Sequence, residues 1–238
     1  MIVNYTEAGW QIVTQRGHGL LAAQLCAQWK KNKQPARWME TLIATAEHDD
    51  VYNEFDNEHL LDVNGAPLNF KATKFDQETA QALIDMAETK SAYIALLISR
   101  HIQFVHGSDP NSSSFIKKLV QLEKGWLKIA QTSATEISQS YDLLEFCDAF
   151  SLLICQGLIQ PEGRSIQISE GPDKRRYDMF MRDEKLAVTP WPFEIASFQV
   201  SYETRTLSQL SFKSSKEFRE AFKSTRATTH QITLCKDK

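Results

Sequence analysis

The stretch TAEHDD at residues 45–50 ends an apolar run that begins at Trp38, and it places a histidine beside a pair of aspartates. The apolar positions of this run recur with the 3.6-residue period of a helix, and Asp49 falls on the same face as Trp38. Because His48 and Asp49 are adjacent, their side chains diverge by about 100° around the helix axis. A single ion therefore does not easily bind both His48 and Asp49 as inward ligands. Both can be ligands if the site holds two ions, or if the broad edge of the helix faces the site.

Three further polar residues interrupt apolar helical runs elsewhere in the chain: His18, His101 and Asp148. His18 begins the inward stripe of the helix expected over residues 18–31, and His101 lies in the stripe of a later helix. Asp148 lies in the centre of residues 140–155, which are apolar nearly all round, as in a helix buried in the middle of a bundle. A lone buried carboxylate costs several kcal/mol, so Asp148 requires a strong partner.

Two interpretations of these residues remain open. Imidazoles and carboxylates on facing helices suit divalent iron, manganese, zinc or magnesium. In the structural alternative, His48 caps the C-terminus of its helix, His101 is a hydrogen-bonded core histidine, and Asp148 pairs with an arginine such as Arg100. Each residue alone fits the structural interpretation. Together they favour a metal site, because three inward histidines and a buried aspartate need mutual compensation.

The remaining pattern predicts a single domain over residues 1–238 that is mainly α. Helical periodicity covers about residues 15–160, which we expect to form a helical bundle. A β-hairpin precedes it, and after Gly157 the pattern changes to short strands, turns and one short helix. Residues 161–238 are therefore expected to form a β-rich appendage that packs on the core, covers the site and contributes no ligand.

The composition argues against several classes of function. Of the 238 residues, 42% are hydrophobic and 24% are charged, and the net charge of -3 does not favour nucleic acid or anionic lipid. No apolar run approaches the length of a membrane span, and the N-terminus lacks the basic start and apolar core of a secretory signal. The four cysteines form no CxxC pair. We therefore expect a cytoplasmic protein with reduced thiols and no nucleic-acid or membrane partner.

The ordered set of His18, the pair His48-Asp49, and Asp148 resembles the signature of the HD superfamily of metal-dependent phosphohydrolases. The resemblance implies an HD-like helical bundle. The set is also similar to the subset of that superfamily that binds two metals and includes mixed-valent di-iron oxygenases. In that subset the aspartate matching Asp49 bridges the ions, and His101 matches a ligand of the second ion. The helical pattern turns His106 to another face, so no role is predicted for it.

Over almost its whole length the chain further resembles an uncharacterised bacterial family of unknown function. The points of similarity are the Met-Ile-Val start, Thr14-Gln15 near His18, residues 46–50, the helix around Asp148, and Pro190-Trp191-Pro192-Phe193. This second resemblance supplies no activity.

The resemblance to the HD superfamily implies hydrolysis of a phosphate ester, on a small-molecule substrate, by metal-activated water. His18, His48, Asp49 and Asp148 would bind the first of one or two divalent ions, and His101 a second. Asp49 would act in catalysis together with Arg16 or Arg100, either of which would steady the leaving oxyanion. The alternatives are a di-iron oxygenase on the same ligands and a non-catalytic helical interaction or sensing module. Neither the substrate nor the oligomeric state follows from the sequence.

Overall fold

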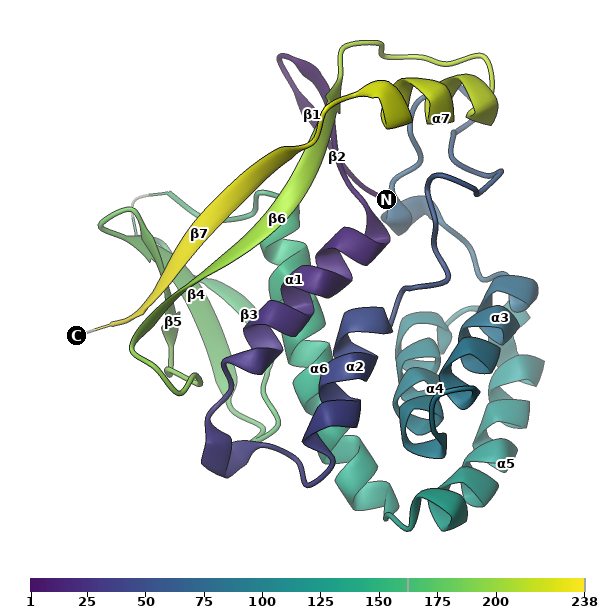
Figure 1. Ribbon diagram of the computed structural model, residues 1–238, viewed down its shortest axis with the longest axis vertical. Coiled ribbons are helices and arrows are strands. Elements are labelled where there is room, and N and C mark those ends of the chain that lie inside the picture. The colour runs from purple at the N-terminus through teal and green to yellow at the C-terminus, as the bar shows by residue number, and fades with distance from the viewer. Residues whose placement is uncertain (162, 238) are drawn as a thin grey trace.

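The structure, a computed structural model, describes residues 1–161 and 163–237. A seven-stranded sheet forms one side of the molecule and a group of helices forms the other (Figure 1). The prediction of a mainly α, HD-like bundle is wrong. The chain is 46% helical and 22% strand, and its sheet is mixed, so the fold is α/β. The short strands at the two ends of the chain, which the sequence suggested as a hairpin and an appendage, combine into one sheet.

The sheet has the strand order β1-β2-β6-β7-β5-β4-β3. Its strands are β1 (Ile2–Thr6), β2 (Gly9–Val13), β3 (Ile166–Glu170), β4 (Arg176–Arg182), β5 (Lys185–Thr189), β6 (Ser197–Leu207) and β7 (Thr228–Lys236). The pairs are antiparallel except for β5 with β7, which run parallel. The N-terminal hairpin joins the C-terminal strands where β2 pairs with β6, with Trp10 opposite Leu207.

The described parts of the chain also contain seven α-helices. They are α1 (Gln15–Ala27), α2 (Trp38–Glu47), α3 (Gln77–Glu88), α4 (Ala92–His106), α5 (Ser113–Ala130), α6 (Ala134–Cys155) and α7 (Ser215–Ser224). Short 3-10 turns lie at Lys31–Lys33, Phe70–Ala72 and Pro110–Ser112. Polar side chains start several helices by accepting a backbone N–H of the first turn, as Thr14 does for α1 and Ser133 for α6.

Helix α6 connects the two halves of the molecule. It packs against α1, α2 and α4 and also against β3, so neither face of its central part is free (Figure 1). Phe146 and Phe150 belong to the core that includes the sheet, whereas Leu144 belongs to the core among the helices. This double contact explains why the sequence of α6 is apolar nearly all round. It also places Asp148 in the interior.

None of the helices within residues 1–161 and 163–237 is both long and apolar enough to cross a lipid bilayer.

Candidate metal centre

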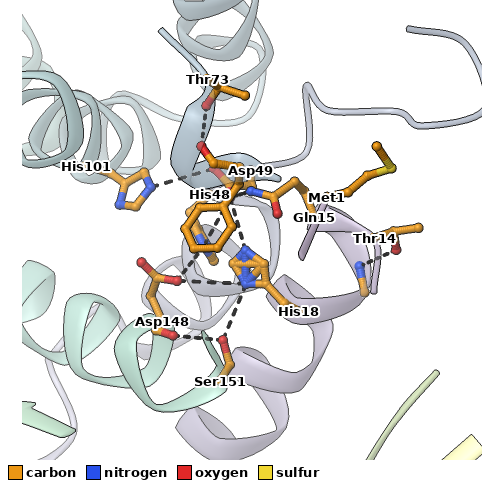
Figure 2. A network of polar contacts seen from close by, with 12 residues as sticks. Met1, Thr14, Gln15, His18, His48, Asp49, Thr73, His101, Asp148 and Ser151 are labelled. Atoms are coloured by element: carbon orange, nitrogen blue, oxygen red, sulfur yellow. Dashed lines mark hydrogen bonds and ion pairs between the residues drawn. The ribbon is translucent and has the colours of Figure 1, made fainter. Parts of the chain in front are cut away.

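Four helices bring the five predicted ligand residues to one place (Figure 2). His18 lies in the first turns of α1, His48 and Asp49 follow the last turn of α2, His101 lies late in α4, and Asp148 lies in the middle of α6. The three imidazoles are buried and the two carboxylates are nearly so, with 14% of the Asp49 side chain exposed. The structure therefore brings together all five residues that the sequence suggested as ligands. Whether they bind metal remains a prediction.

The ligand atoms face one another at short range. His18 Nε2 lies 3.1 Å from Asp49 Oδ2, and His48 Nε2 lies 3.2 Å from Asp148 Oδ1. His101 Nε2 lies 3.7 Å from the other oxygen of Asp49, Oδ1. Two overlapping groups, His18 with His48 and Asp49, and His48 with His101 and Asp148, each offer three ligand atoms within 4.8 Å of one another. His48 belongs to both groups, and its ring lies edge-on between the rings of His18 and His101.

The orientation of His48 is fixed by its own helix. Its Nδ1 lies 2.8 Å from the carbonyl oxygen of Thr45 in the last turn of α2. A carbonyl oxygen only accepts hydrogen bonds, so Nδ1 carries the proton and Nε2 of the neutral ring presents a lone pair. The structural interpretation of His48 as a helix cap is thus correct for one nitrogen and leaves the other directed into the cluster.

The Nε2 atom of His48 lies close to a carboxylate oxygen of Asp148 but forms no aligned hydrogen bond with it. His48 Nε2 and Asp148 Oδ1 are both buried and have no aligned hydrogen-bond partner among the described residues, although they lie 3.2 Å apart. A lone pair of neutral imidazole directed at a carboxylate lone pair is repulsive. Either a proton or a metal cation must therefore lie on this nitrogen, and buried atoms of this kind require a partner.

The electrostatics of the cluster favour positive charge beside the two carboxylates. Burial lowers the pKa of His48, but the charges of Asp148 and Asp49 outweigh burial and raise this pKa to about 9. Burial, followed by the charge of His48, lowers the pKa of His18 to about 4. Burial raises the pKa of Asp49 and Asp148, yet His48 and the other histidines hold both pKa values below the ordinary range. Two ionised carboxylates thus share one buried space, and their negative charge must be compensated. A divalent cation can compensate it as well as a proton does.

Neighbouring side chains that the sequence did not suggest hold the ligands in place. Gln15 Nε2 donates to Asp49 Oδ2 at 2.7 Å. Ser151 Oγ lies 3.4 Å from His18 Nδ1, and the Tyr141 hydroxyl lies 3.5 Å from His101 Nδ1. Contacts of this kind orient the outer atoms of metal ligands. Ser151 has a recognisable signal, since it lies one turn after Asp148 on α6, and Gln15 likewise lies one turn before His18 on α1, whereas Tyr141 has none.

The two arginines suggested for catalysis lie in different surroundings. Arg100 pairs with the buried Glu123 of α5 at 2.9 Å, so the structure does not bring it into the cluster. Arg16 lies on α1, two residues before His18, and its guanidinium Nε donates to the backbone oxygen of Asp50 at 2.8 Å. It also pairs with the Asp50 carboxylate at 3.4 Å, and its side chain is 44% exposed.

A small cavity of about 30 Å³ adjoins the cluster and is lined by Asp49, His101 and His106, among others. His106, the last residue of α4, contacts the ring of Phe75 but also borders this space. The position of His106 near the cluster was missed because an α-helical period places it off the face of His101, whereas the chain after α2 folds over that part of α4.

The family model described as "Protein of unknown function (DUF3891)" matches residues 1–209 of the chain. No curated protein and no solved structure matches it. All residues of both ligand groups lie within the matched part. Among the described residues, the strands after Gly157 contribute to neither group.

Proposed function

The chain belongs to the DUF3891 family, whose function is unknown, and we propose from its own residues that it is a metal-dependent hydrolase of a phosphate ester. The observation that carries the proposal is the buried contact of His48 Nε2 with Asp148 Oδ1. Thr45 fixes the tautomer that makes this nitrogen a ligand. Three imidazoles and two carboxylates form a donor set suited to iron, manganese, zinc or magnesium.

The class of reaction rests on the order of the ligands along the chain. His18, then His48-Asp49, then Asp148 is similar to the signature of the HD phosphohydrolases, which is the support for a phosphate ester as substrate. A bound divalent ion would lower the pKa of the water molecule that it holds, and it would neutralise part of the negative charge on the phosphoryl group.

Asp49, Gln15 and Arg16 have separate roles in the proposed reaction. Asp49 is the most exposed of the five ligands and borders the small cavity, so it lies where a substrate would enter. Gln15 holds one of its oxygens, which keeps the carboxylate in a fixed orientation. Arg16 is the arginine that would steady a leaving oxyanion, because its partner Asp50 lies at the surface, whereas Arg100 is held by the buried Glu123.

A second candidate, a di-iron oxygenase, is favoured by the position of Asp49. Its Oδ2 faces His18 while its Oδ1 faces His101, so Asp49 would be able to offer one oxygen to each of two ions. The same ligands would then hold two irons with open positions for a chelating substrate.

Metal analysis combined with a paired assay tests both candidates. The protein is purified without chelator, its metals are quantified, and hydrolysis of p-nitrophenyl phosphate and its diester is measured with manganese, zinc, magnesium or iron. We expect stoichiometric metal and metal-dependent hydrolysis. Asp148→Asn should lose both, whereas Asp142→Asn, a control on the same helix that pairs with Lys174, should retain both.

The outcomes separate the candidates. Two bound irons with oxygen consumption and no phosphate release would favour the oxygenase. A protein that binds no metal under any of these conditions would contradict both enzymes and favour a non-catalytic module.

A further inference from the structure

A much larger cavity, of about 660 Å³, lies at the other end of the helices that carry the metal ligands. It is lined by Trp29 after α1, Arg37 before α2, Tyr93 at the start of α4, and Ser140 in the first half of α6. Arg37 and His48 are separated by the length of α2, about 15 Å at 1.5 Å per residue. The cavity is therefore a separate site from the small space beside Asp49, with which it shares no lining residue.

The walls of this cavity are aromatic and firmly held. Trp29, Tyr93 and Tyr177 line it and are each at most 5% exposed. Trp29 packs edge-on against Phe146, and the Tyr93 hydroxyl is 2.7 Å from Ser140 Oγ. The indole N–H of Trp29 is buried and lacks an acceptor among the described residues. Trp191 also lines the cavity and is only half-buried, so part of its ring is open to a ligand. A partly open indole in a rigid aromatic surround suits a planar ring, because little side-chain entropy is lost on binding.

The rim of the cavity carries more available positive charge than negative. Its described lining includes four cations, Lys30, Lys33, Arg37 and Arg175, and two acidic residues, Glu136 and Asp173. Glu136 accepts hydrogen bonds from Ser133 in the cap of α6, and Asp173 lies within reach of the Tyr177 hydroxyl. Lys33 forms no ion pair among the described residues. Arg175 has only a loose contact with Asp173, at 3.8 Å, and is 74% exposed.

Two more cations line the cavity but are already bound. Lys30 Nζ donates to the carbonyl oxygen of Trp191 at 2.7 Å. Arg37 pairs with Glu40 and lies over the ring of Tyr93. Lys33, together with the loosely paired and largely exposed Arg175, is thus best placed to receive an anionic group.

We propose that this cavity is a binding site for a small, planar aromatic or heteroaromatic anion. The ring lies between the aromatic walls, and the anionic group meets Lys33 and Arg175 at the rim. The volume falls within the range of about 300–1,000 Å³ that is typical of small-molecule sites. The proposal does not depend on the metal centre or on its chemistry.

The probe for the test is anilinonaphthalene sulfonate, an aromatic anion whose fluorescence rises on binding, titrated into the full-length protein. We expect one-to-one binding, with the neutral analogue phenylnaphthylamine binding about tenfold more weakly or worse. The double variant Lys33→Glu/Arg175→Glu should weaken binding of the sulfonate by about tenfold or more. Gln139→Trp, which fills the cavity from an exposed position on α6, should weaken the binding of both the sulfonate and its neutral analogue.

The matched control is Lys117→Glu/Lys124→Glu, which makes the same change of charge on the exposed face of α5, away from the cavity. It should leave the affinity within about twofold of the wild type. Circular dichroism of each variant establishes that it is folded. Absence of sulfonate binding, equal loss in the control, or unchanged binding in both cavity variants would overturn the proposal.

Discussion

At the scale of single residues, the side chains that can neutralise Asp148 within the described parts of the chain are histidines. The arginine that a purely structural role would require is not available, since Arg100 is paired with Glu123 on the far side of α4. The nearest basic side chains are the rings of His48 and His18, at 3.2 and 3.8 Å from Asp148 Oδ1. A buried carboxylate surrounded by imidazoles is more typical of a metal ligand than of a structural ion pair.

We therefore expect Asp148→Ala to disturb the protein more than Asp148→Asn. Asparagine keeps the volume and one acceptor oxygen, so this variant should fold but bind metal poorly. Alanine leaves His48 uncompensated and adds a cavity, which should lower the free energy of unfolding by about 3–5 kcal/mol. Urea unfolding and metal content, each with and without chelator, measure both effects. If chelator leaves the wild type unchanged and both variants keep full metal, Asp148 is structural.

A second prediction at this scale concerns Glu145, three residues earlier on α6. Burial raises the pKa of Glu145 to about 7, although its hydrogen bond to Ser169 opposes this. The pKa of Glu145 in the folded state lies above its ordinary value of 4.5. Its contribution to the free energy of unfolding is therefore largest below about pH 4.5 and is lost as the pH rises through 7.

Glu145→Gln should remove this decline. The variant should match the wild type in free energy of unfolding near pH 5 and exceed it by about 1–2 kcal/mol at pH 8. Urea unfolding across this range provides the measurement, and the value at pH 5 serves as the internal reference. An equal difference at both pH values would show that the glutamate is not the source.

At the scale of elements, the metal centre depends on how closely α1 approaches α2. A Cβ atom added at Gly19 would lie 2.6 Å from the carbonyl oxygen of Ala46 and 3.8 Å from the His48 ring. The first distance is too short for any side chain, so the two helices meet here only because residue 19 is glycine. Gly19 therefore sets the distance between His18 and the His48-Asp49 pair.

Gly19→Ala should push α1 away from α2, lower the free energy of unfolding by about 1–3 kcal/mol, and weaken metal binding. The control is Gly125→Ala in the exposed middle of α5, where an added Cβ meets nothing within 4 Å. That variant should gain about 0.5–1 kcal/mol from helix propensity and keep its metal. Thermal unfolding and metal titration of both variants decide the matter; unimpaired metal binding by Gly19→Ala would contradict the role assigned to this contact.

Periodicity predicted the faces of these helices better than it predicted their partners. The nearly all-round apolar sequence of residues 140–155 reports burial, and Asp148 is indeed interior. No local pattern, however, records that Gln15 binds Asp49 or that Arg100 turns to Glu123. Such contacts depend on side-chain reach and tertiary placement, which a one-dimensional period does not contain.

The fold class was missed for a related reason. The strands of the C-terminal half can be recognised one by one, but β2 pairs with β6, which lies almost two hundred residues further along the chain. Register of this kind is set by burial of one face of the completed sheet, not by the sequence of either strand alone. Strands that were individually recognisable were therefore assigned to separate pieces instead of to one mixed sheet.

At the scale of the whole molecule, the sheet makes the two ends of the chain depend on each other. Ile2 and Val13 of the N-terminal hairpin share a core with Phe198 and Leu234, which lie on β6 and β7. Helix α1, which carries His18, follows this hairpin directly and packs against β6. The position of His18 thus depends on strands that contribute no ligand themselves.

A chain that ends at Gln160 should therefore fail to fold, even though it contains all five ligand residues. It would leave β2 without β6 and expose Phe146 and Phe150, which the sheet covers in the complete chain. We expect this fragment to be insoluble or to unfold without cooperativity, and to bind no stoichiometric metal. Co-expression with residues 161–238 should recover soluble complex, because the missing strands are restored without a covalent link. Solubility, cooperative thermal unfolding and metal content are compared with those of the full-length protein. A soluble fragment of residues 1–160 that unfolds cooperatively and binds metal would show that the helices form an independent core and that the sheet is dispensable.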